Sequence, residues 1–100
     1  MIIVNKTGLF NAWLENLKDR QAYARIVARI DRMADGNFGS FRNFQGGISE
    51  LKINYGPGYR IYYCQEGDVV YLLLCGGTKK TQQNDIELAR EMRHLPAAAL

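Results

Sequence analysis

Basic residues in the second half of the chain have types and spacings that suggest chemistry. Lys52 and Arg60 lie in segments with a strand pattern, and Lys79 and Lys80 follow the next such segment. Arginine can hold a phosphate through two parallel hydrogen bonds, and Tyr62 offers a ring on which a base could stack. The set therefore predicts a surface that binds a phosphate backbone. A solvated sheet face with long polar side chains has the same pattern, and spacing alone does not separate the two.

The other reactive residues do not form a recognisable site. Cys64 and Cys75 lack the spacing of a zinc site and are too few for a disulfide framework. Cys75 precedes a glycine pair, but the sequence places no histidine to activate it, because His94 falls near the C-terminus. The segment 76–80 (GGTKK) lacks the GxxxxGK[ST] spacing of a nucleotide-binding loop. We therefore expect neither a metal nor a cofactor.

Composition predicts the number of domains and the compartment. A chain of 100 residues with 47 % hydrophobic residues can build one modest core, so we expect a single domain over residues 1–100. No segment approaches the ~20 apolar residues of a membrane-spanning helix, and the apolar start is too short for a signal peptide. These observations predict a cytoplasmic protein. The net charge of +3 permits a polyanionic partner without requiring one.

The hydrophobic periodicity predicts an α+β protein. Helical spacing follows two good N-cap residues, Thr7 and Asp19, and occurs again over 82–93. Residues 38–47, with three phenylalanines and a glycine pair, are predicted to form an irregular loop. The predicted order is strand (2–4), helix (10–17), helix (19–34), strands (49–55, 59–65 and 69–75) and helix (82–93). Three arginines of the second helix are expected to face solvent: Arg25, Arg29 and Arg32.

Two turns determine the predicted register of the strands. A two-residue loop at 67–68 places Arg60 opposite Cys75, and a three-residue loop at 56–58 places Asn54 opposite Arg60. The face expected to pack on the helices carries Leu51, Ile53, Ile61, Tyr63, Val70, Leu72 and Leu74. The other face, expected to be open and polar, carries Glu50, Lys52, Asn54, Arg60, Tyr62, Tyr71, Leu73 and Cys75.

Four stretches of the chain give it a family resemblance. They are FNAWLENL, ARIVARIDRMADGNFG, GGISELKINYGPGYRIYY and YLLLCGGTKKTQQNDIELA, and the GPGYR and LLCGG parts are the most specific. With them the chain resembles the RelE/ParE superfamily of toxins from type II toxin–antitoxin systems, and more narrowly its HigB-like branch. The resemblance implies a β-α-α-β-β-β-α fold in which two N-terminal helices cover one face of an antiparallel sheet. It also implies cleavage of messenger RNA without a metal, commonly on the ribosome.

The resemblance also implies roles for individual residues. Arg60 matches the strand arginine at the scissile phosphate, Lys52 a basic position on the preceding strand, and Lys80 (or Lys79) a basic position after the last strand. Lys52 is a candidate base for the ribose 2′-OH, and Glu50 is a second one. No tyrosine follows the lysine pair and Thr78 replaces an acidic residue, so the general acid is unassigned. The further residues expected to bind RNA are Lys79, Tyr62, Asn54 and Arg42.

The same resemblance implies protein partners and leaves two other functions open. A cognate antitoxin, of the helix-turn-helix type, is expected to neutralise the toxin and to bring the pair to its promoter DNA. The missing C-terminal tyrosine is compatible with a ParE-like protein that inhibits DNA gyrase without catalysis. A degenerate toxin that acts only as an antitoxin-binding module is the third interpretation.

Overall fold

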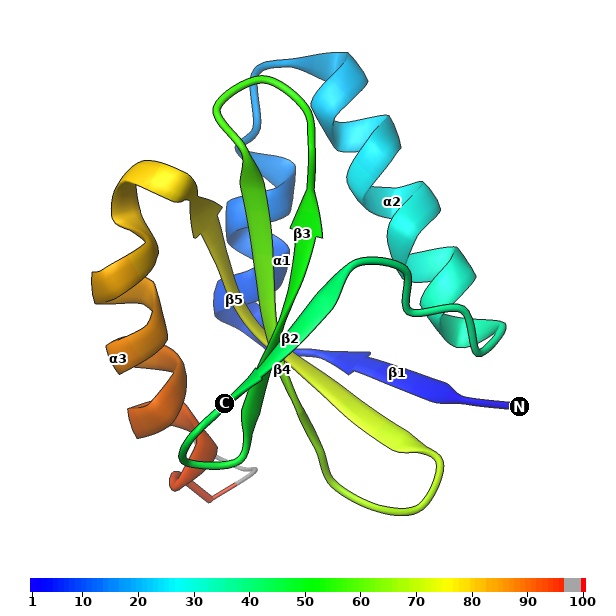
Figure 1. Ribbon diagram of the computed structural model, residues 1–100, viewed down its shortest axis with the longest axis vertical. Coiled ribbons are helices and arrows are strands. Elements are labelled where there is room, and N and C mark those ends of the chain that lie inside the picture. The colour runs from blue at the N-terminus through cyan, green and yellow to red at the C-terminus, as the bar shows by residue number, and fades with distance from the viewer. Residues whose placement is uncertain (97–99) are drawn as a thin grey trace.

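The computed structural model describes residues 1–96 and 100, and it confirms the α+β class (Figure 1). Caps begin the first two helices where the sequence predicts them. The Thr7 hydroxyl accepts a hydrogen bond from the Phe10 N–H at 3.0 Å, and the Asp19 carboxylate accepts from the N–H groups of Gln21 and Ala22. The elements are β1 (Ile3–Lys6), α1 (Gly8–Glu15), α2 (Arg20–Ala34), β2 (Phe41–Phe44), β3 (Ile48–Ile53), β4 (Tyr59–Gln65), β5 (Val70–Thr78), a short 3-10 helix η1 (Lys79–Thr81) and α3 (Gln82–Arg93).

The strands form one sheet in the order β1-β5-β4-β3-β2. β1 pairs with β5 in parallel, and the other neighbours are antiparallel. β2 lies within the segment 38–47, which was predicted to be an irregular loop. The glycine pair explains the difference, because Gly46 and Gly47 both adopt positive φ and turn the chain so that β2 folds back onto β3. β2 is therefore one edge of the sheet.

Two hydrophobic cores lie on opposite faces of the sheet. α1 and α2 cover one face, as predicted, and their buried residues pack against β3, β4 and β5. α3 covers the other face with Ile86, Ala89 and Met92 (Figure 1). The prediction of an open polar face is therefore wrong over the part that α3 covers. The second core contains Ile48, Tyr62, Cys64, Leu72, Leu74, Cys75, Ile86, Ala89 and Met92.

A β-bulge accounts for the exchanged faces of β5. Tyr62 pairs with Cys75 and Tyr63 with Leu73, so Leu74 is an extra residue with no partner on β4. Because of this extra residue, the side chains of β5 that precede Leu74 point to the opposite faces of the sheet from those predicted. Leu73 therefore packs beneath α1 and α2, whereas Leu72 belongs to the core under α3, opposite to the prediction.

Within the part of the chain that the structure describes, no helix has the length and apolar character needed to cross a membrane.

Candidate functional site: a cationic pocket

The observed register gives Arg60 neighbours other than those predicted. Arg60 pairs with Lys52 on β3 and with Gly77 on β5, not with Asn54 and Cys75. The turn between β3 and β4 spans residues 54–58 rather than 56–58, which moves the pairing by two residues. A shift of two preserves the face of each side chain, so Lys52 and Arg60 still share one face of the sheet.

Strands β2, β3 and β4, the short helix η1 and the start of α3 line a cavity of about 390 Å³, which we call the cationic pocket. Four basic side chains and one carboxylate line it, giving a formal charge of +3 from four positive charges and one negative charge. The basic residues come from four different elements, so the fold holds together charges that would otherwise repel one another. The lining residues are Ser40, Phe41, Arg42, Glu50, Lys52, Arg60, Lys79 and Gln82.

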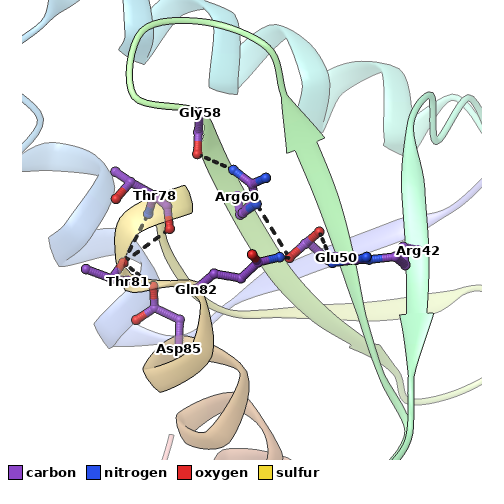
Figure 2. Close-up of polar contacts among 8 residues, drawn as sticks. All are labelled: Arg42, Glu50, Gly58, Arg60, Thr78, Thr81, Gln82 and Asp85. Carbon is purple, nitrogen blue, oxygen red and sulfur yellow. Dashed lines mark hydrogen bonds and ion pairs between the residues drawn. The ribbon is translucent and has the colours of Figure 1, made fainter.

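Arg60 is an unusually buried arginine, because only 5 % of its surface is exposed. Its Nη1 atom donates a hydrogen bond of 2.6 Å to the carbonyl oxygen of Gly58 (Figure 2). The same carbonyl accepts a 2.8 Å hydrogen bond from the Lys79 N–H, which ties η1 to the turn before β4. The Arg60 Nε atom is buried without a hydrogen-bond partner among the described residues. The guanidinium is thus held by the backbone and keeps donor capacity for an anion in the pocket.

Glu50 lines the pocket between Arg42 and Arg60, and it is 3 % exposed. Its Oε2 atom lies 3.8 Å from Arg60 Nε and accepts a 2.9 Å hydrogen bond from Gln82 Nε2. Its Oε1 atom lies 3.8 Å from Nη2 of Arg42, whose side chain is mostly exposed. Figure 2 shows Glu50 between the two arginines, with Gln82 reaching it from the start of α3. The carboxylate therefore balances a buried charge and links α3 to the sheet.

A threonine–aspartate network supports the turn that carries Lys79. The Thr81 hydroxyl donates a 2.6 Å hydrogen bond to Asp85 and accepts one of 3.2 Å from the Thr78 N–H (Figure 2). Gly77 lies directly against this network, and a Cβ atom there would collide with the Asp85 carboxylate. The network fixes the path of the chain from β5 into α3, which places Lys79 at the pocket.

The structure brings together five of the residues predicted from the sequence, namely Arg42, Glu50, Lys52, Arg60 and Lys79. The other three lie elsewhere. Lys80 is exposed on η1 outside the pocket lining, and Asn54 lines a separate groove beside α2. Tyr62 is fully buried beneath α3, so the prediction that it stacks on a base is wrong. Burial, together with the nearby Glu50 carboxylate, raises the pKa of the Tyr62 phenol.

Sequence reasoning also misplaced the role of Arg29 and missed Gln82. Arg29 was expected to face solvent, but its guanidinium donates hydrogen bonds to the carbonyl oxygens of Lys52, Phe38 and Ser40. It therefore fixes the backbone on the α2 side of the pocket. Gln82 gave no signal beyond its place at the start of a predicted helix, because its role depends on how α3 packs on the sheet.

The two cysteines lie outside the lining of the cationic pocket. Cys64 and Cys75 are free and buried, and burial raises the pKa of both thiols, that of Cys75 to about 12. Among residues 1–96 and 100, no three histidine, cysteine, aspartate or glutamate side chains gather as a metal ion would need.

The fold and the pocket together define a small α+β protein with a cavity lined by buried Arg60 and by exposed Lys52 and Lys79. Residues 12–94 match a family described as phage-derived protein Gp49-like, and the chain belongs to this family, which is toxin-like and related to RelE and ParE. A protein of Haemophilus influenzae, described as uncharacterized, is 47 % identical over 91 residues, which cover 90 % of this chain and 92 % of that protein.

Proposed function

We propose that this chain is the toxin of a type II toxin–antitoxin module, of the HigB-like kind, and that it cleaves messenger RNA in the cytoplasm without a metal. The observation that carries the proposal is the cationic pocket, where four basic side chains and Glu50 line one cavity of about 390 Å³. Exposed lysines can hold the backbone on either side of the scissile phosphate, and a buried arginine can bind the phosphate itself. The family supports the toxin assignment.

The chemistry that suits these residues is attack of the ribose 2′-oxygen on the adjacent phosphorus. The Glu50 carboxylate accepts the 2′-hydroxyl proton as the new P–O bond forms. The bond from phosphorus to the 5′-oxygen then breaks, and the Lys79 ammonium donates a proton to that leaving oxygen. Arg60 and Lys52 stabilise the negative charge that develops on the phosphorane. The products are a 2′,3′-cyclic phosphate and a free 5′-hydroxyl.

Partners follow from the same proposal. The cognate antitoxin, of the helix-turn-helix type, binds the toxin, and promoter DNA is reached through the antitoxin. Cleavage takes place on messenger RNA during translation, so the ribosome is the second partner.

The test uses exposed residues whose replacement leaves the core intact. Wild type, Lys52→Ala, Lys79→Ala and the double variant are induced without the neighbouring gene, and new RNA 5′ ends are mapped. Lys18→Ala, exposed and outside the pocket, is the matched control. We expect growth arrest and new 5′-hydroxyl ends with wild type and Lys18→Ala, reduced in each pocket variant and lost in the double variant.

Three results would overturn the proposal. Cleavage by the double variant at the wild-type rate would remove the pocket from the reaction. Unchanged RNA together with inhibited supercoiling by gyrase would assign the chain to the ParE-like class. Harmless induction of an intact wild-type protein that still binds the product of the neighbouring gene would make it a partner-binding module.

A further inference from the structure

A second and larger cavity, of about 530 Å³, meets the cationic pocket at the edge strand β2 and has no role in the proposed chemistry. Its aromatic wall lies on the α1/α2 side of the sheet, whereas Glu50 and Arg60 of the cationic pocket lie on the α3 side. The two cavities share Phe41, which lines both, and we call the second one the aromatic groove. Its volume lies within the range of about 300–1,000 Å³ that is common for small-molecule sites. Its lining is Phe38, Phe41, Asn43, Phe44, Gly47, Ile48, Ser49, Tyr63, Gln65, Tyr71 and Arg93.

Four aromatic rings form a connected wall in this groove. The Phe38 ring centroid lies 6.0 Å from that of Phe41, 6.0 Å from that of Tyr63 and 5.2 Å from that of Tyr71. Three of these rings are held by packing, whereas Phe41 is 51 % exposed on the edge strand β2. Phe41 therefore offers the most exposed ring of the four.

Polar groups in the groove can donate hydrogen bonds. The Asn43 side-chain oxygen accepts a 2.6 Å hydrogen bond from the Ser49 hydroxyl, so the Asn43 amide turns its N–H donors elsewhere. The Nε atom of Arg93 is buried and has no hydrogen-bond partner within the described part of the chain. A nucleobase presents carbonyl and ring-nitrogen acceptors around a flat aromatic face, which matches these donors and rings.

From this juxtaposition we infer that the aromatic groove binds an RNA base next to the phosphate held in the cationic pocket, with Phe41 as the stacking ring. The inference rests on the proposed function, because it extends the same substrate by one nucleotide. β2 is the edge of the sheet, so single-stranded RNA can pass from one cavity to the other around Phe41. Phe41 thus takes the stacking role that buried Tyr62 cannot fill.

Charge favours RNA over a protein segment as the occupant. The cationic pocket carries a formal charge of +3, and Arg93 adds one cation to the lining of the aromatic groove. Single-stranded nucleic acids bind by this combination of cationic contacts to the backbone and aromatic contacts to the bases. An extended protein segment laid along the β2 edge is the competing occupant, and the experiment separates the two.

The experiment compares binding of two probes of equal length and charge. The first is a mixed-sequence single-stranded oligonucleotide with 2′-O-methyl riboses, which cannot be cleaved, and the second is its abasic counterpart. The proteins are wild type, Phe41→Ala, Phe41→Tyr, which keeps a ring, and Val69→Ala, an exposed apolar control outside both cavities. Circular dichroism and a thermal melt verify that each variant is folded.

We expect wild type to prefer the base-bearing probe by at least about fivefold, the lower end of what stacking one base contributes. Phe41→Ala should bind both probes as weakly as wild type binds the abasic one, whereas the Tyr and Val69→Ala variants should keep the preference. A preserved preference in Phe41→Ala would overturn the inference. It would do so even if the Lys52→Ala and Lys79→Ala variants of the cleavage test, measured with the same two probes, bind both probes more weakly than wild type and so support the proposed function. Wild type that binds neither probe would contradict both proposals.

A further outcome assigns the groove to a protein. If Phe41→Ala binds both probes like wild type but no longer co-purifies with the product of the neighbouring gene, the groove is a partner interface and the inference about RNA is wrong.

Discussion

Replacing Glu50 by glutamine removes the negative charge at the centre of the cationic pocket and keeps the shape of the side chain. Arg60 Nε lies 3.8 Å from Glu50 Oε2 and both side chains are almost fully buried. At an effective dielectric constant of about 20, two unit charges at this separation attract by about 4 kcal/mol. The exposed Arg42 adds at most about 1 kcal/mol, and the amide oxygen can still accept from Gln82. We therefore expect Glu50→Gln to lower the free energy of unfolding by about 4–5 kcal/mol, at the upper end of the range for breaking a buried ion pair.

The assay is urea unfolding monitored by the fluorescence of Trp13, the single tryptophan, which packs against the ring of Phe10. A double-mutant cycle with Arg60→Met isolates the pair, because the double variant contains neither charge. We expect a coupling energy of about 2 kcal/mol or more, and Glu15→Gln, an exposed carboxylate on α1, should change stability by less than about 0.5 kcal/mol. If the loss of stability in the double variant equals the sum of the losses in the two single variants, the view that Glu50 balances a buried Arg60 is refuted.

The same substitution separates binding from chemistry. Glu50→Gln raises the formal charge lining the pocket from +3 to +4, so affinity for RNA should be kept or increased. Cleavage should fall by about 10²-fold or more, because the amide cannot take up the 2′-hydroxyl proton. A folded Glu50→Gln protein that cleaves RNA at the wild-type rate would exclude Glu50 as the base.

Three further predictions concern positions away from the pocket. Gly76→Ala should destabilise the protein by about 1–3 kcal/mol in urea unfolding, because a Cβ atom there would collide with the rigid Trp13 ring. Cys75 should resist iodoacetamide at pH 8 in the native protein and react in urea, since burial raises its pKa to about 12; rapid native labelling, read by mass spectrometry, would contradict this. On folding, the pKa of Asp19 is lowered by hydrogen bonds from Tyr55 and from two backbone N–H groups. The stability that Asp19 contributes is therefore present above its unfolded-state pKa, and it is lost as pH falls through its folded-state pKa. Asp19→Ala should therefore lower Tm at pH 7 but have much less effect at about pH 2.5.

The helices could be predicted because their signals are local. Thr7 and Asp19 cap the helices that follow them, and α3 spans the predicted residues 82–93. A cap depends on a residue and the next three, so the sequence contains the whole interaction. Which face of the sheet α3 covers depends on residues far away in the sequence. The apolar side of α3 therefore gave no indication of that face.

The strand register shows how far local reasoning extends. The β3–β4 pairing differs from prediction by two residues, so Lys52 and Arg60 stayed on a common face. The β4–β5 pairing contains a bulge at Leu74, and one extra residue exchanged the faces of β5. Bulges depend on packing between distant elements rather than on a turn sequence, so the turn at 67–68 could not reveal this one. Tyr62 lies on the predicted face of the sheet, but it is buried because α3 covers that face, which the sequence did not show.

One glycine of the GPGYR stretch, Gly58, and one of the LLCGG stretch, Gly77, determine the geometry of the pocket. Gly58 adopts a φ of +79°, and its carbonyl oxygen accepts from both Arg60 Nη1 and the Lys79 N–H. Gly77 lacks the Cβ atom that would displace Asp85 and with it the turn carrying Lys79. A side chain at either position would move a cation of the pocket without removing any reacting group. The motifs by which the sequence resembles the RelE/ParE toxins are therefore explained by the backbone path that buries Arg60 and aligns Lys79 beside it.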